Sequence, residues 1–161
     1  MKTLVRALIL LLIVLWLGGV MFFPIVAATS FNSIADTHAA GTIVGKCLRT
    51  LHHEGLFAGT LIVLLLLIAQ RIRAYTRVAL PVIFAFIMLA LTAFSQFWII
   101  PKMESYRLAA GGAVDAVAVT DPNRIAFNKL HIASEHTEEG VLLAGIVLVI
   151  LVAREEGARD T

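Results

Sequence analysis

The chain has 161 residues, of which 60% are hydrophobic and 15% charged, and its formal net charge is +2. A soluble domain is about half apolar and about a quarter charged, so this composition indicates a membrane protein in contact with the lipid bilayer. The small net charge and the lack of a basic stripe with interleaved aromatic residues argue against a nucleic-acid partner. Cys47 is the only cysteine, which excludes an internal disulfide and a cysteine-rich metal site.

The first apolar run extends from Ala7 to Ala28 and follows a short basic start at Lys2 and Arg6. At about 1.5 Å per helical residue it covers about 33 Å, enough to cross the hydrocarbon layer. A cleaved signal peptide is the alternative, because Val26-Ala27-Ala28 resembles a small-residue cleavage site. The run is longer than a usual signal core of about 7–15 residues, so we expect a retained helix over about residues 4–32.

The next two runs differ in length. Leu56 to Ala69 covers only about 21 Å, whereas Val78 to Ile100 covers about 34 Å and closes at Pro101-Lys102. The longer run alone predicts a membrane-spanning helix over about residues 77–100. The shorter one spans a bilayer only if its helix, over about residues 39–70, also includes one or two turns of the preceding polar segment.

The last run, Val141 to Ala153, covers about 20 Å and is likewise too short to cross the hydrocarbon layer by itself. Its helix is expected over about residues 124–154, preceded by a turn at Asp121-Pro122-Asn123. The sequence therefore predicts an all-α, four-helix integral membrane bundle that forms one domain over residues 1–161. Its second and fourth helices bring polar side chains into the bilayer.

Basic residues indicate how the bundle is oriented. Most of them fall on one side of the predicted membrane: Lys2, Arg6, Arg71, Arg73, Arg77, Arg154 and Arg159. The loop between the first two helices has no Lys or Arg before Lys46, whereas Lys102, Arg107 and Arg124 in the other outer loop reduce the bias. Because basic loops stay in the cytoplasm, both termini are expected there, in a bacterial inner membrane.

Small residues and a histidine share one face of the second helix. At 100° per residue, five positions fall within about 80° of one another: Gly41, Gly45, His52, Gly55 and Gly59. Small residues let helices approach closely in lipid, and Gly18 and Gly19 are expected to allow such an approach at the first helix. This glycine stripe predicts helix packing and places His52 inside the bundle, while His53 is expected to face headgroups or water.

The fourth helix carries a matching polar face. It contains His131, Ser134, Glu135 and Glu138. Counting up from the cytoplasmic helix ends places four side chains in one layer about 26–27 Å high: His52, Gln96, Ser134 and Glu135. His131 is expected one turn above Glu135 and Glu138 one turn below. The sequence thus predicts a polar cluster in the outer half of the bundle.

This cluster admits several functions. Imidazole is a common ligand of haem iron and copper, so His52 and His131 are candidate ligands of a redox component. The alternative is a buried hydrogen-bonded network that sets the register of two helices. No hydrolase, phosphate-binding or haem-attachment motif is present. We therefore expect a non-enzymatic membrane protein of undetermined role, assisting a larger complex or small-solute passage; docking of a partner or second copy on the glycine stripe is a further alternative.

Three groups of residues, taken in order, resemble one known family. They are Leu15-Trp16-Leu17-Gly18-Gly19 with Phe22-Phe23 and Phe31; Trp98 through Pro101 and on to Arg107; and Phe127-Asn128-Lys129-Leu130-His131 with Ser134. In this order and spacing, the chain resembles the transmembrane-protein-205-like proteins, a group of uncharacterised four-helix membrane proteins. The resemblance covers the first, third and fourth helices.

That family is distantly similar to copper-resistance-D-like membrane proteins and to haem-containing protoporphyrinogen oxidases. The resemblance implies an outward-facing histidine site for copper or haem b. Only His131 and Ser134 lie on a family motif. Where members often have an amide residue after this motif, the present chain has Glu138.

Overall fold

The computed structural model of the chain describes residues 1–157, with side chains through Arg154. Four helical segments are long and apolar enough to cross a membrane: Lys2–Ser33, Thr37–Arg71, Ala79–Ala109 and Pro122–Arg154. An isolated helix satisfies its own backbone hydrogen bonds, which is the condition for crossing lipid. The predicted all-α fold with four candidate membrane spans is confirmed.

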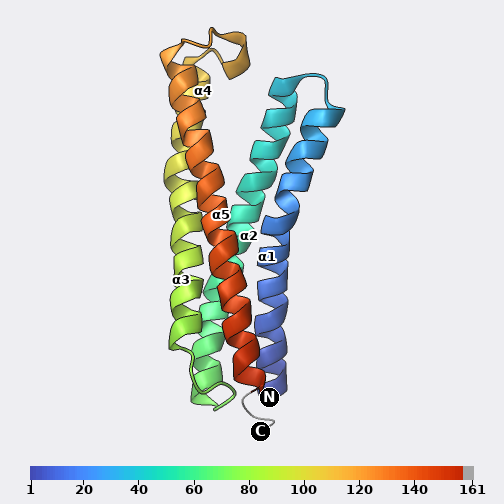
Figure 1. Ribbon diagram of the computed structural model, residues 1–161, viewed down its shortest axis with the longest axis vertical. Coiled ribbons are helices and arrows are strands. Elements are labelled where there is room, and N and C mark those ends of the chain that lie inside the picture. The colour runs from blue at the N-terminus through green and yellow to red at the C-terminus, as the bar shows by residue number, and fades with distance from the viewer. Residues whose placement is uncertain (158–161) are drawn as a thin grey trace.

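The helices form an antiparallel bundle (Figure 1). Its elements in chain order are α1 (Lys2–Ser33), α2 (Thr37–Arg71), α3 (Ala79–Phe94), the π-helical turn η1 (Ser95–Ile99), α4 (Ile100–Ala109), the 3-10 turn η2 (Val114–Ala116) and α5 (Pro122–Gly157). The α1–α2 pair and the unit formed by α3, α4 and α5 pack together at the end that holds the N-terminus, and they diverge toward the other end. We call the half away from the N-terminus the distal half.

The third span is longer than predicted. It was expected to end near Ile100, but it continues through Pro101, which lies in the first turn of α4. Just before the proline the helix widens, and Ile100 N–H bonds to the carbonyl of Ser95, five residues back. A proline in the first turn lacks only a hydrogen bond that the turn does not need, and a π-helical turn absorbs the local change in spacing. The stop occurs instead at Gly111 and Gly112, whose φ angles of +80° and +93° favour glycine.

Apolar side chains from all four spans meet in the core. Trp16, Ile62, Met88 and Leu148 are each at most 1% exposed. Many large apolar residues point outward instead, such as Leu11, Leu64, Ile83 and Leu143. An apolar outer surface on every span is what lipid contact requires, so the fold is that of a multi-pass membrane protein.

Two glycines of the expected stripe accommodate Trp16. A Cβ at Gly55 would overlap the Trp16 indole, and a Cβ at Gly59 would lie 2.7 Å from Leu89 Cδ2 and 2.8 Å from Trp16 Cη2. Gly19 likewise leaves room for Leu51, whose Cδ1 would be 2.6 Å from an added Cβ. These three positions let α1 and α2 approach closely, as small residues do in membrane bundles.

The remaining glycines of the stripe lie elsewhere. Gly18 and Gly45 have no atom within 4 Å of an added Cβ, and Gly41 makes only an ordinary contact of 3.8 Å with Phe31. The expectation that one continuous stripe packs against a neighbouring helix is therefore wrong for the distal part of α2. At Gly18 and Gly45 no neighbouring atom of the described residues limits the size of a side chain, and at Gly41 the neighbour is at an ordinary contact distance.

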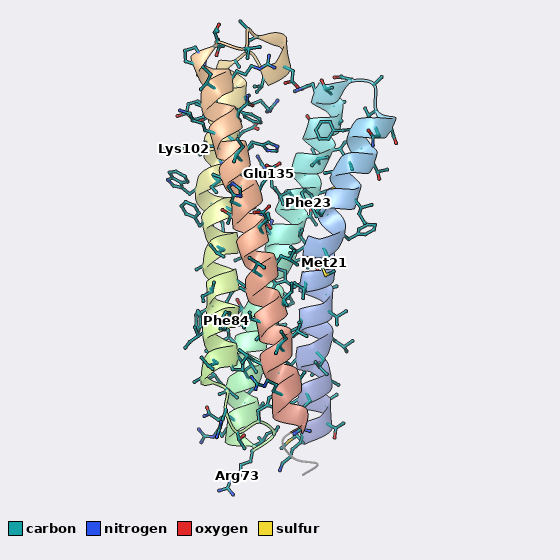
Figure 2. The ribbon with its side chains drawn as sticks, in the orientation of Figure 1. Met21, Phe23, Arg73, Phe84, Lys102 and Glu135 are labelled. Atoms are coloured by element: carbon teal, nitrogen blue, oxygen red, sulfur yellow. The ribbon has the colours of Figure 1, made fainter. Side chains whose placement is uncertain are left out.

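The two ends of the bundle carry different polar anchors. At the N-terminal end, Arg6 Nη2 donates to the carbonyl of Ala74 at 2.7 Å, and Figure 2 shows Arg73 at the same end. In the distal half, Phe94 stacks on Trp98 at 5.0 Å, and Lys102 Nζ lies 4.8 Å from the Trp98 ring. Tryptophan and lysine are typical of a membrane–water interface, so Trp98 marks the level of the distal interface.

Candidate functional site: a buried histidine between an amide and a carboxyl

His52 joins three elements of the bundle. It lies on α2 and is only 1% exposed. Its Nδ1 is 3.1 Å from Oε1 of Gln96 in η1, and its Nε2 is 2.7 Å from Oε1 of Glu138 on α5. Both polar atoms of the ring therefore have partners, as buried polar groups in lipid require. We call these three residues the His52 cluster.

The π-helical turn brings Gln96 to this position. One extra residue in the turn shifts the direction of every side chain that follows it, and such turns are frequent at functional sites. Gln96 lies two residues before Trp98, which marks the distal interface. The His52 cluster is thus in the distal half, just inside the membrane–water boundary.

Glu138, and not Glu135, is the carboxyl that reaches His52. The sequence-based layer contained Glu135 because it took Ala153 as the lower end of the last helix. In the structure α5 continues to Gly157, one turn further. His52 and Glu138 each lie 19 residues from the described ends of their helices, Arg71 and Gly157. When the lower end of the helix is moved by one turn, Glu138 takes the depth that was assigned to Glu135. Glu138 is three residues further along the chain and lies on nearly the same face of the helix.

Glu135 and His131 do not join the cluster. They pair with each other at 3.4 Å on the surface of α5, with side chains that are 60% and 57% exposed. Figure 2 places Glu135 on the stretch of α5 where the helix units diverge. His131 is also stacked on Phe127, with ring centroids 6.3 Å apart. Ser134 is 5% exposed and lies one turn above Glu138.

A second histidine connects the cluster to the surface. The exposed ring of His53 donates from Nδ1 to the carbonyl of Arg49 at 2.6 Å, and its Nε2 is 3.5 Å from Nε2 of Gln96. The sequence analysis placed His53 among headgroups or water and missed this contact. Its position next to His52 was the available signal, but only the tertiary structure shows that Gln96 lies between the two rings.

The Arg49 carbonyl fixes the direction of the whole chain of hydrogen bonds. A carbonyl only accepts, so His53 Nδ1 must donate, and the Nε2 of a neutral His53 must accept. Gln96 then turns its NH2 group to His53 and its oxygen to His52. His52 Nδ1 therefore donates to Gln96, which leaves His52 Nε2 without a proton if that ring is neutral.

One further proton must lie between His52 and Glu138. Their facing atoms are 2.7 Å apart, and two unprotonated acceptors at that distance would repel each other. Either His52 is an imidazolium beside a carboxylate, or Glu138 is a neutral acid that donates to the ring. In both cases the cluster holds one exchangeable proton inside the bundle.

Two buried hydroxyls increase the polarity of this region. Ser95 precedes Gln96 and is fully buried, and Thr92 lies one turn earlier and is 1% exposed. Neither hydroxyl has a hydrogen-bond partner among residues 1–154. Within the part of the chain that the structure describes, these two hydroxyls add unpaired polar groups to the buried surroundings of Gln96.

An ion pair crosses between the helix units on the distal side of the cluster. Arg49 of α2 lies 4.0 Å from Glu104 of α4, which also accepts two hydrogen bonds from Arg107 at 2.6 and 2.9 Å. The side chains of Arg49 and Glu104 are 46% and 36% exposed. Exposed pairs of this kind contribute at most about 1 kcal/mol, so this contact can break and form readily.

The geometry does not favour the haem or copper hypothesis. Both nitrogens of His52 are engaged, and His131 lies about 10 Å along α5 from the Glu138 that contacts His52. Among the residues that the structure describes, no group of three or more His, Cys, Asp or Glu side chains is placed to hold a metal ion. A ligand role for His52 and His131 stays a prediction, and it would require His52 to lose one of its two partners.

The fold and the cluster define a multi-pass membrane protein with an ionisable group buried among its spans. Residues 11–111 match the family described as "Domain of unknown function (DUF4149)"; this is more than half of the chain, so the chain belongs to that family. The match includes His52, His53 and Gln96, whereas Glu138 lies beyond it. No curated protein and no solved structure matches the chain.

Proposed function

We propose that the chain is a non-enzymatic membrane protein that holds one proton between His52 and Glu138 and exchanges it with the distal interface through Gln96 and His53. The observation that carries this proposal is the unbroken series of contacts from exposed His53 through buried His52 to half-buried Glu138. Ionisable side chains within membrane spans are costly and often belong to proton relays.

Rotation of the Gln96 amide supplies the exchange step. In the first state His53 is neutral, the Gln96 oxygen faces His52, and the shared proton lies between His52 Nε2 and Glu138. To exchange a proton, the Gln96 oxygen takes the Nδ1 proton of His52, the amide rotates, and the oxygen gives this proton to His53 Nε2. In the second state His53 donates from Nε2 to the Gln96 oxygen, and the Gln96 NH2 group donates to His52 Nδ1. His52 then donates from Nε2 to a Glu138 carboxylate. The number of protons is the same in both states, and each state satisfies both ring nitrogens of His52.

The relay ends inside the membrane. Closer to the N-terminal end than Thr92 and Ser95, most buried side chains are apolar, among them Ile62, Met88 and Leu148. Among the described residues, a proton that enters from His53 therefore meets no further hydrogen-bonded route to the opposite interface. Figure 2 places Glu135, one turn from Glu138, on the stretch of α5 where the helix units diverge, so a change in the protonation of the cluster acts close to the point where α2 and α5 separate. This position suits a protein in which protonation controls the passage of a small solute.

Replacing Gln96 by methionine tests the relay. We expect the exchange of the His52 Nδ1 proton with water to slow by up to about tenfold. The change removes one hydrogen bond of the relay, and a loss of about 1.4 kcal/mol corresponds to a tenfold lower rate. Nitrogen-15 NMR of the histidine-labelled chain in liposomes measures the exchange and the tautomer of His52. Gln70→Met, at an exposed position of α2, is the matched control. Equal exchange rates in the native chain and Gln96→Met would refute the relay.

We infer that the termini face the cytoplasm of a bacterial cell, as the distribution of basic residues predicts. Lys2, Arg6, Arg71 and Arg154 lie at the N-terminal end of the bundle, and the distal loop after α1 has no basic residue. A reporter that is active only in the cytoplasm should work when fused after Thr161 and should fail when inserted at Ala35, between α1 and α2. The reverse pattern would contradict this orientation and place the His53 end of the relay in the cytoplasm.

The resemblance to transmembrane-protein-205-like proteins supports this assignment at the level of a four-helix membrane protein. Docking of a partner helix on the face of α2 that carries Gly41 and Gly45 stays a separate prediction. It does not conflict with the relay, because those glycines lie outside the His52 cluster.

A further inference from the structure

A groove lies between α1 and α2, on a different side of α2 from the His52 cluster. It has a volume of about 350 Å³, which is within the range of small-molecule sites. The α1 wall is apolar and includes Phe22, Phe23 and Val26, with Gly19 leaving space at one end. The α2 wall includes Glu54, two residues from His52. Figure 2 labels Phe23 on this part of the bundle.

Glu54 lines this groove and carries a carboxyl oxygen without a hydrogen-bond partner among the described residues. Its Oε1 is buried and has no hydrogen-bond partner among residues 1–154. Glu104 and Glu138, in contrast, each contact a nitrogen of another side chain. A buried carboxyl oxygen without a donor is costly, so the groove lacks a hydrogen-bond donor at this point.

We infer that the groove binds an amphiphilic amine, with its ammonium group on Glu54 and its alkyl chain along α1. An ammonium group supplies both the N–H donors and the positive charge that a carboxylate accepts. Phe22, which is 59% exposed, and Phe23 offer aromatic faces that attract an organic cation. An inorganic cation fits less well, because Mg²⁺ and Ca²⁺ require about six or more oxygen ligands and the groove offers one carboxylate.

The ammonium of a zwitterionic lipid headgroup is the competing source of the same chemistry. Lys46 is the cation that lines the groove, and it lies eight residues, or about 12 Å, from Glu54 along α2. A zwitterionic headgroup would also bring a phosphate group close to the Glu54 carboxylate, and the two negative charges repel each other. A free amine needs Glu54 alone, and the inference does not depend on proton exchange at Glu138.

Calorimetric titration of the full chain in phosphatidylglycerol nanodiscs with octylammonium tests this site, with empty nanodiscs used to subtract partitioning. We expect saturable binding that Glu54→Gln weakens about tenfold or more, since a charged hydrogen bond contributes about 1.5–3 kcal/mol. Glu139→Gln is the matched control, because Glu139 is 68% exposed and pairs with His136. Octanol, which has the same chain without the charge, should not show saturable binding.

Three results would overturn the inference. Equal octylammonium affinity of the native chain and Glu54→Gln would show that the Glu54 carboxyl does not contribute to binding. Octanol binding as tightly as octylammonium would show that only apolar burial matters. Loss of octylammonium binding when phosphatidylethanolamine replaces phosphatidylglycerol would assign the groove to a lipid headgroup. As Glu54→Gln could also alter folding, Val26→Trp provides a second variant that fills the groove and leaves Glu54 in place; it should abolish binding.

Discussion

Replacing Glu138 by alanine is expected to lower the free energy of unfolding by about 3 kcal/mol. The change leaves the Nε2 atom of His52 buried without a partner, and His52 is 1% exposed. An unsatisfied buried neutral group costs about 1–3 kcal/mol, and a buried charge that loses its partner costs about 3–5 kcal/mol. The expected value lies where these ranges meet. Reversible unfolding in mixed micelles, monitored by circular dichroism, measures it.

The size of this loss distinguishes the His52 cluster from an ordinary polar contact. Side-chain hydrogen bonds between membrane helices contribute about 0.6 kcal/mol on average. Glu135→Ala, at a position 60% exposed, should change stability by less than about 0.5 kcal/mol. Changing His52 and Glu138 together to leucine should recover part of the loss, because the buried imidazole is gone and only the half-buried Gln96 oxygen loses its partner. If Glu138→Ala behaves like Glu135→Ala, the pair is not a significant buried interaction.

The membrane fold followed from the sequence because hydrophobic length is a strong signal. The apolar runs at Leu56–Ala69 and Val141–Ala153 were too short for a bilayer, which required α2 and α5 to carry polar residues into it. That argument identified the two helices that supply His52 and Glu138. Hydrophobic length does not determine how deep one helix lies relative to another, so the relative depths depended on where each helix was assumed to end.

The choice between Glu135 and Glu138 shows where this reasoning stops. One additional turn at the end of α5 moved every depth on that helix by about 5.4 Å, enough to exchange one carboxyl for another. The π-helical turn at Ser95–Ile99 is equally hidden, since its residues have no special pattern and Pro101 indicated a stop. Helix ends and local changes in helical spacing depend on tertiary packing, so side-chain partners across helices cannot be read from periodicity alone.

Glycine patterns have the same limitation. Gly41, Gly45, Gly55 and Gly59 share one face of α2 and look equivalent in the sequence. Gly55 and Gly59 are the two at which an added Cβ would overlap α1, because Trp16 occupies the space that their missing side chains leave, whereas Gly41 makes only an ordinary contact with Phe31. The stripe therefore indicates that close packing is possible along α2, and the position of Trp16 decides where it occurs.

Gly55→Ala is expected to destabilise the bundle by about 3 kcal/mol, although alanine normally favours a helix by about 1 kcal/mol over glycine. The added Cβ would overlap the Trp16 indole, with Cε2 at 2.7 Å, and Trp16 is 1% exposed, so the ring has no free space to enter. Gly45→Ala is the matched control on the same helix; with nothing within 4 Å, it should be neutral or slightly stabilising. Trp16→Leu should abolish the difference between the two alanine variants, since a smaller side chain leaves room for the methyl group. Equal stability of Gly55→Ala and Gly45→Ala in the presence of Trp16 would mean that α1 and α2 are not held together by this contact.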